Sequence, residues 1–150
     1  TSGLLLFSLT ERAHKHLQQQ FINKEIQKRY VALIAGTLTE TSGVITLPLI
    51  TDFNDRPRQK VCFEHGKRAE TRWRVLATKN SVTRVELNPV TGRTHQLRVH
   101  CAHPQGLNTP ILGDGLYGIS ANRLHLHAQQ LSFTHPVTKQ PMHFSVAADF

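Results

Sequence analysis

Apolar residues recur at distinct spacings along the chain, and each spacing predicts a type of element. Between Ala13 and Phe21 they recur every four residues, which predicts an amphipathic helix that Thr10 caps and that ends near Asn23. The unbroken apolar run 4–7 is typical of a strand buried on both faces.

Segments rich in β-branched and apolar residues predict further strands at 27–37, 43–50, 58–63, 68–77, 81–87, 124–133 and 141–146. The segments 58–63 and 68–77 flank His65-Gly66-Lys67, so we expect them to form a hairpin, after a polar loop at 52–58. Within 68–77, apolar and small residues alternate with Arg72 and Arg74, which predicts a sheet with one solvent-exposed face. The fold class is therefore α+β: a mostly antiparallel mixed sheet with a few flanking helices.

A dense polar segment, Gly92-Arg93-Thr94-His95-Gln96-Leu97-Arg98-Val99-His100, follows the strand breakers around Pro89. Leu97 and Cys101 lie four residues apart, which predicts a short helix that opens near Thr94. Free backbone N–H groups, two arginines and two histidines at one corner suit a polyanion. The alternative is an ordinary basic surface helix.

Composition favours a single domain with an acidic partner. The 150 residues carry a net charge of +8, so nucleic acid is the first candidate, against a basic protein with no polyanion partner. The two cysteines, Cys62 and Cys101, lie in apolar-patterned segments and are expected to be reduced core thiols of a cytosolic protein. No apolar run approaches the roughly 20 residues of a membrane span.

Histidines raise the possibility of a hydrolytic zinc site. The histidines that could lie close together are His95, His100, His103, His125 and His127. Asp114 is the one acidic residue near them, and the basic surroundings repel a cation, so we expect no metal site.

Five motifs resemble, in the same order, those of the RluA-type RNA pseudouridine synthases. Besides the segment 92–100, they are Thr1-Ser2-Gly3-Leu4-Leu5-Leu6-Phe7, Lys28-Arg29-Tyr30-Val31-Ala32, Pro110-Ile111-Leu112-Gly113-Asp114 and Leu124-His125-Leu126-His127-Ala128. The resemblance covers essentially the whole chain, and it implies a pseudouridine-synthase-like catalytic domain that isomerises uridine in RNA without a metal or a cofactor. The stretch 47–62 is most similar to the RluA subgroup, which acts on ribosomal RNA and tRNA.

The family's catalytic motif reads His-Arg-Leu-Asp-x-x-Thr-Ser-Gly, so the resemblance implies that the nucleophilic aspartate precedes Thr1 by three residues. We therefore expect residues 1–150 to be a partial catalytic domain that lacks its N-terminal portion and is inactive alone. The matching arginine, Arg98, orients that aspartate in the family. Without the aspartate, Arg98 is expected to rotate outward or to capture an anion or another carboxylate, because an unpaired buried guanidinium is costly.

The resemblance also implies roles for other residues. Tyr30 would stack on the target uracil and is a candidate acceptor of its C5 proton, whereas without the resemblance it is a tyrosine packed on a sheet. Leu126 would flank the base. The expected RNA contacts are Lys28, Arg29, Arg56, Arg58, Lys60, Arg93, Thr94, His95 and Gln96.

The implied partner is ribosomal RNA, with tRNA as a further candidate, and the implied protein is a cytoplasmic monomer when full length. Two alternatives remain open: a non-catalytic RNA-binding module and a hydrolase with a histidine metal site. One departure affects substrate choice, since Asn108-Thr109 stands where the family usually has Gly-His.

Overall fold

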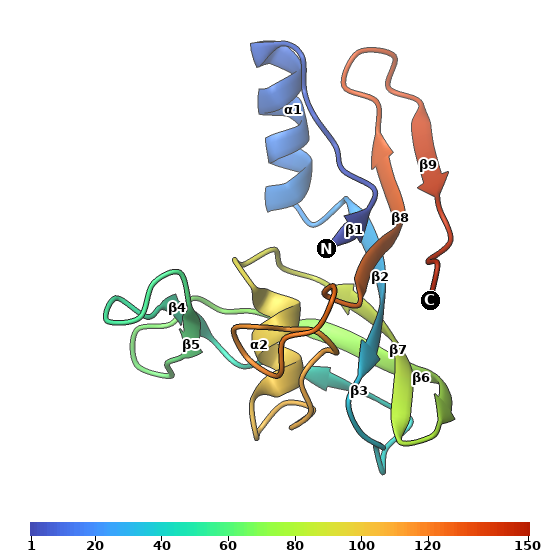
Figure 1. Cartoon of the computed structure of the whole chain (residues 1–150). Coiled ribbons are helices and arrows are strands. Elements are labelled where there is room, and N and C mark those ends of the chain that lie inside the picture. The colour runs from blue at the N-terminus through green and yellow to red at the C-terminus, as the bar shows by residue number, and fades with distance from the viewer.

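The computed structural model describes residues 1–150 and contains two helices and nine strands (Figure 1). Seven strands form one sheet in the order β1-β8-β2-β7-β6-β3, with β9 also paired to β8, and β4 and β5 form a separate two-stranded sheet. The elements are β1 Ser2–Gly3, α1 Glu11–Ile22, β2 Gln27–Ile34, β3 Ser42–Ile45, β4 Leu49–Thr51, β5 Gln59–Val61, β6 Thr71–Lys79, β7 Val82–Pro89, α2 Gln96–Ala102, β8 Leu126–Thr134 and β9 Pro141–Ser145. All pairs are antiparallel except β1 with β8, so the predicted mixed α+β fold is confirmed.

The first helix forms as its sequence pattern predicts. Thr10 is extended and its hydroxyl accepts a hydrogen bond from the N–H of Ala13 at 3.1 Å, which satisfies one of the free donors of the first turn. Leu17 packs against Phe133 of β8. The buried Gln20 side chain both donates to and accepts from the backbone of Thr134, which fixes the helix to the strand end.

The predicted buried strand at 4–7 is wrong. Leu5 and Phe7 are each 75% exposed, and regular pairing ends after Gly3. Gly3 has a φ of +99°, and its backbone runs so close to that of Ala128 that no side chain would fit. Only Ser2 and Gly3 pair with β8, and the apolar run that follows them leaves the sheet.

The predicted hairpin around His65-Gly66-Lys67 is also wrong. The strand expected at 43–50 divides into β3 and β4, interrupted by Pro48, whose ring removes a ladder donor. Strand β5 returns to pair with β4 across the polar loop 52–58, whereas β6 pairs with β3 and β7. The β4–β5 hairpin thus stands away from the main sheet (Figure 1).

Alternation along the central strands gives the main sheet two different faces. Thr71 and Trp73 of β6 are buried on the face that α2 covers, together with apolar residues of β2 and β7. Arg72 and Arg74 project from the other face, which no helix covers, as the alternation predicts.

The two thiols are free, and they differ in burial. Cys101 is fully buried in the main core, and burial raises the pKa of its thiol to about 12. Cys62 is only half-buried, so the expectation of a core position holds for Cys101 alone. Neither helix combines the length and apolar character needed to cross a membrane.

Candidate active site

Arg98 on α2 is held by Asp114, a residue of the long loop between α2 and β8. Its Nε and Nη2 donate to the two carboxylate oxygens at 2.9 and 2.6 Å, the bidentate geometry that arginine favours. The Arg98 side chain is 18% exposed and Asp114 is fully buried. Arg98 therefore does not rotate outward as an unpaired guanidinium: it is paired with a carboxylate of this chain.

The Asp114 carboxylate also accepts hydrogen bonds from its own loop. Besides the two bonds from Arg98, Oδ1 accepts from the backbone N–H groups of Leu116 and Tyr117 at 3.0 and 3.1 Å. Burial opposes ionisation of this group, but the bonds from Arg98 and the two N–H groups outweigh it, and its pKa lies below the ordinary value. Asp114 is thus an ionised anchor for Arg98.

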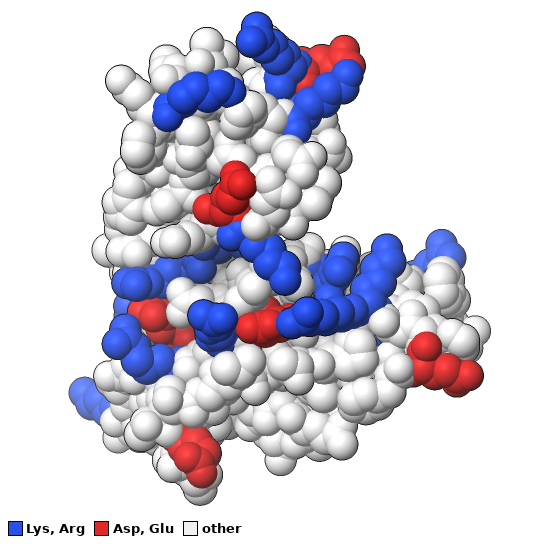
Figure 2. Space-filling view, turned by 180° about the vertical axis from the view of Figure 1, so that it is seen from behind, with Lys and Arg blue, Asp and Glu red and all other residues white.

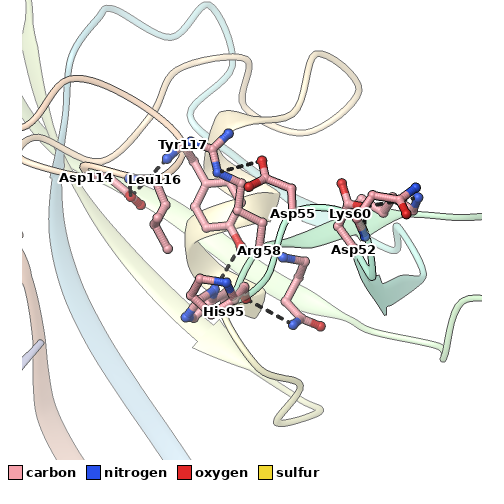
Figure 3. A network of polar contacts seen from close by, with 11 residues as sticks. Asp52, Asp55, Arg58, Lys60, His95, Asp114, Leu116 and Tyr117 are labelled. Atoms are coloured by element: carbon pink, nitrogen blue, oxygen red, sulfur yellow. Dashed lines mark hydrogen bonds and ion pairs between the residues drawn. The ribbon is translucent and has the colours of Figure 1, made fainter.

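Tyr117 joins this ion pair to the β4–β5 hairpin (Figure 3). The Arg98 guanidinium lies 5.2 Å from the centre of its ring, and its hydroxyl accepts from the N–H of Gln59 at 2.8 Å. The same hydroxyl lies 2.8 Å from Nδ1 of His95. Burial and the charge of Arg98 lower the pKa of His95.

Sequence reasoning did not single out Tyr117 or the role of Asp114. The available signal was the motif Gly113-Asp114 followed by an aromatic residue three positions later. An aspartate that accepts from N–H groups two and three residues ahead is a common turn former, so the sequence alone favours a loop and says nothing of a partner on α2.

The turn before α2 differs from the prediction. The helix begins at Gln96, not near Thr94, and His95 precedes it in the left-handed region with a φ of +53° and no side-chain cap. The buried Gln96 amide accepts from Thr91 and from the N–H of Arg93, and it donates to the backbone of Glu70. Gln96 therefore shapes the turn from within the protein and presents no atom to a ligand.

The histidines do not gather into a metal site. The structure contains no group of three or more histidine, cysteine or acidic side chains placed to hold an ion. His100 is fully buried between the Thr71 hydroxyl and the carbonyl of Leu47, and burial lowers the pKa of its ring. His127 contacts the hydroxyl of Ser2 instead.

Tyr30 and Leu126 lie on the covered face of the sheet. Tyr30 of β2 is half-buried against the main core, and burial raises the pKa of its hydroxyl. Leu126 opens β8 and pairs with Ala32, two residues further along the same strand as Tyr30. The two side chains that the resemblance assigns to the base pocket thus belong to the same cluster of residues.

The expected RNA contacts do not form one patch. Arg56, Arg58 and Lys60 lie in or beside the loop of the β4–β5 hairpin. Arg58 and Lys60 are paired with Asp55 and Asp52 at 3.4 and 3.5 Å.

The remaining expected contacts lie nearer to the sheet. Arg93 and Thr94 are in the turn before α2, where Arg93 donates to the carbonyl of Arg68. Successive residues of β2 point to opposite faces, so Lys28 shares the face of Tyr30 and Arg29 does not. Burial lowers the pKa of Lys28, whose ammonium lies 5.7 Å from the ring centre of Phe21.

Comparison with known proteins identifies the family. Residues 1–103 match the family model described as RNA pseudouridylate synthase. The chain belongs to the RNA pseudouridylate synthase family. Proteins described as dual-specificity RNA pseudouridine synthase RluA are 47% identical in Yersinia pestis, 48% in Pasteurella multocida and 44% in Escherichia coli K12. Each alignment covers 100% of this chain and 74%, 70% and 70% of the relative, which confirms the RluA-type resemblance.

Solved structures of family members share the fold. Human RNA pseudouridylate synthase domain containing 1 superposes with a TM-score of 0.79 at 28% identity, over 95% of this chain. Human RNA pseudouridylate synthase domain containing 4 gives a TM-score of 0.72 at 25% identity, over 92% of this chain. The chain spans 62% and 64% of those two proteins.

Proposed function

We propose that the protein isomerises uridine to pseudouridine in RNA, with ribosomal RNA as substrate and tRNA as a second. The reaction breaks the N-glycosidic bond, turns the base and rejoins it through C5, which needs a nucleophile, a flipped base in a dry pocket and an acceptor for the C5 proton. With such substrates, the cytoplasm is the proposed place of action, and a monomer the proposed form. Family membership supports this activity, and the buried Arg98–Asp114 pair is the observation that carries it to a site.

We propose that the nucleophile is an aspartate that precedes Thr1 by three residues. Strand β1 is parallel to β8, with Ser2 opposite His127. If the chain continued upstream in this register, that aspartate would lie opposite Arg123, about 13 Å along the strand from Ser2. The residues just after Arg123 run beside the backbone that leads to Asp114, since the N–H of His125 donates to Leu112. The register thus supports a nucleophile close to Arg98.

Arg98 is suited to hold that carboxylate. Its Nε–Nη2 edge is occupied by Asp114, whereas Nη1 has no hydrogen-bond partner in the structure. Because a guanidinium does not lose its proton at any relevant pH, it can keep an incoming aspartate ionised. In this proposal Asp114 and Tyr117 fix the guanidinium, and Nη1 meets the nucleophile.

Tyr30 and Leu126 would form the base pocket. Tyr30 offers an aromatic face for stacking and a hydroxyl as the proposed acceptor of the C5 proton, and Leu126 offers an apolar flank. Burial raises the pKa of Tyr30, so its hydroxyl is neutral. In this proposal the hydroxyl takes up the C5 proton as its own proton passes to the uracil nitrogen freed from the glycosidic bond.

The expected phosphate contacts set a salt dependence. The exposed or half-exposed cations Lys28, Arg29, Arg56, Arg58, Lys60 and Arg93, with the Thr94 hydroxyl and the His95 ring, would touch the RNA backbone. If five or six phosphates are contacted, the logarithm of affinity should fall with the logarithm of salt at a slope of about −4 to −5. A slope near zero would contradict this assignment of contacts.

The test is release of tritium from RNA labelled at C5 of uridine. A chain that continues upstream through the proposed aspartate should release tritium, and residues 1–150 alone should not. Tyr30→Phe in the longer chain should lose turnover while it keeps RNA affinity, since only the hydroxyl is removed. Turnover by residues 1–150 alone would show that the nucleophile is assigned wrongly. RNA binding by the longer chain without release would favour a non-catalytic binding module.

A further inference from the structure

The sheet face turned away from α2 carries a polar, arginine-rich surface, of which only Arg29 is among the RNA contacts expected above. Along β2, β6 and β7 this face presents Arg29, Arg72 and Arg74 near Glu70 and Glu86, a surplus of one positive charge. Arg84 is on the same face, but its guanidinium binds the carbonyl of Phe150 and lies over the Phe150 ring. Figure 2 shows this side of the molecule, where lysines and arginines form a band beneath the upper lobe. A positively charged surface of this kind attracts anionic partners.

The buried Glu86 holds Arg29 and Arg74 in place. Glu86, 9% exposed at its side chain, accepts from Arg74 at 3.1 Å and lies 3.4 Å from Arg29, while Asn88 donates to its other oxygen. Burial disfavours the charged carboxylate, but these donors lower its pKa, so Glu86 stays ionised. Arg29 and Arg74 remain 42% and 59% exposed, and Arg72 is 66% exposed, so their outer N–H groups face solvent. Two guanidiniums are thus positioned before any ligand arrives, which reduces the entropy lost on binding.

A pocket of about 270 Å³ opens beside this arginine cluster. No apolar residue lines it, and its lining comes from four strands: Gln27, Lys28, Arg29, Asn88, Gln130, Ser132 and His143. Lys28 lies at its border, because the Lys28 ammonium is turned toward the Phe21 ring of α1. Leu131 and Phe133 of β8 contact α1, so the intervening Gln130 and Ser132 point to the opposite, bare face. Side chains of these types are the usual partners of phosphate and ribose oxygens.

We propose that this groove, formed by the arginine cluster and the pocket, binds the phosphate–ribose backbone of RNA flanking the target uridine. The inference rests on the proposed function, because it gives the same RNA a second contact on the reverse of the sheet. β2 connects the two surfaces: Lys28 and Tyr30 face the covered side, and Gln27 and Arg29 line the groove. RNA that leaves the base pocket therefore needs only to pass round the sheet to reach Arg29.

The first test compares two double variants in RNA binding. Arg29→Gln with Arg72→Gln removes two groove charges and leaves Arg74 and Asn88 on Glu86. Arg12→Gln with Lys139→Gln removes the same charge from exposed positions on α1 and the β8–β9 turn. The probe is a fluorescent RNA stem–loop of about 40 nucleotides with one loop uridine, titrated at several salt concentrations. Loss of two phosphate contacts should flatten the slope of log affinity against log salt by about 1.5 and weaken binding about tenfold at low salt, with the control unchanged.

Probe length separates the groove from the base pocket. A fragment of about three nucleotides has one nucleotide on each side of the target uridine and fills only the base pocket, so the groove variant should bind it as the unaltered protein does. With 4-thiouridine in the stem of the long RNA, crosslinks should fall on peptides of β8 and β9, including His143.

Two results would overturn the proposal. Equal salt slopes for the groove variant and the unaltered protein would show that no phosphate lies there. A changed oligomeric state, with the RNA slope unchanged, would show that the face packs against protein instead. Neither result depends on tritium release, so a failure of the groove is distinguishable from a failure of the catalytic assignment.

Discussion

Replacement of Asp114 by asparagine isolates the electrostatic role of the buried pair. Asparagine has nearly the shape of aspartate, and its oxygen can still accept from the N–H groups of Leu116 and Tyr117. Its amide group would face Nε or Nη2 of Arg98, so two donors would meet where a charge-assisted bond now lies at 2.6 to 2.9 Å. The variant therefore leaves a largely buried guanidinium without a counter-charge.

The size of the effect follows from the burial of the two partners. Removing one partner of a buried ion pair typically costs about 3–5 kcal/mol. Asp114 is fully buried, but Arg98 keeps 18% of its side chain in contact with water, which can rehydrate part of the charge. We expect a loss near the lower end, about 3 kcal/mol, which for a domain of this size lowers the melting temperature by roughly 6–12 °C.

The stability difference between the unaltered protein and Asp114→Asn should also depend on pH. The pKa of Asp114 is lowered in the folded protein, so its stabilisation is fully present above the unfolded-state value near 3.9 and disappears as pH falls through the folded value. The stability gap between the unaltered protein and Asp114→Asn should be constant from about pH 6 to 8 and shrink below about pH 4.

Urea unfolding followed by the fluorescence of Trp73, the single tryptophan, measures this gap, because that side chain lies in the main core. Asp149→Asn is the matched control, since Asp149 also accepts two bonds from one arginine, Arg123, but is largely exposed. Equal losses for the two variants, or a gap that persists unchanged in acid, would refute the argument from burial.

Three further predictions concern the scaffold. Thr10→Ala should lower the free energy of unfolding by about 1 kcal/mol, since one N–H of the first turn of α1 loses its acceptor; urea unfolding checks this, and an unchanged midpoint would contradict the cap. Cys101, whose pKa is raised to about 12 by burial, should resist iodoacetamide at pH 8 in the folded state while Cys62 is modified; mass spectrometry reads both sites, and equal labelling would be inconsistent with this core. Gly113→Ala should sharply reduce the yield of folded protein, because Gly113 has a φ of +78° and an added Cβ would clash with the carbonyl oxygen of Arg123. A normal yield with an unshifted melting curve would argue against that close approach.

The sequence predicts what depends on local periodicity. The helix 11–22 follows from a four-residue spacing and a threonine cap, and the two faces of β6 follow from strict alternation. Strand partners depend on contacts distant in sequence, which periodicity does not encode. For this reason the sequence pattern predicts the wrong partner for 58–63, and it predicts a sheet strand at 4–7, where the chain has left the sheet.

The candidate site shows the same division. Motif resemblance singles out Arg98, but its actual partner, Asp114, is 16 residues further along and is brought to it by a loop with no regular structure. The cap expected at Thr94 fails because Gln96 already binds the donors of the turn from inside. Side-chain networks of this kind depend on packing in three dimensions, and a sequence pattern fixes only which residues are available for them.

The two-residue repeat of β2 makes one short strand responsible for both surfaces of the protein. A substitution at Arg29 alters only the reverse face, and a substitution at Tyr30 alters only the face with the base pocket. An insertion or deletion of one residue in β2 would exchange the two sets of side chains, so evolution can retune RNA affinity here by replacement but not by a change of length. The irregularity at Arg29 and Tyr30 in the pairing with β8 lies on the partner side, where Gln129 is skipped in the register, so the strand that bears both functions keeps its phase.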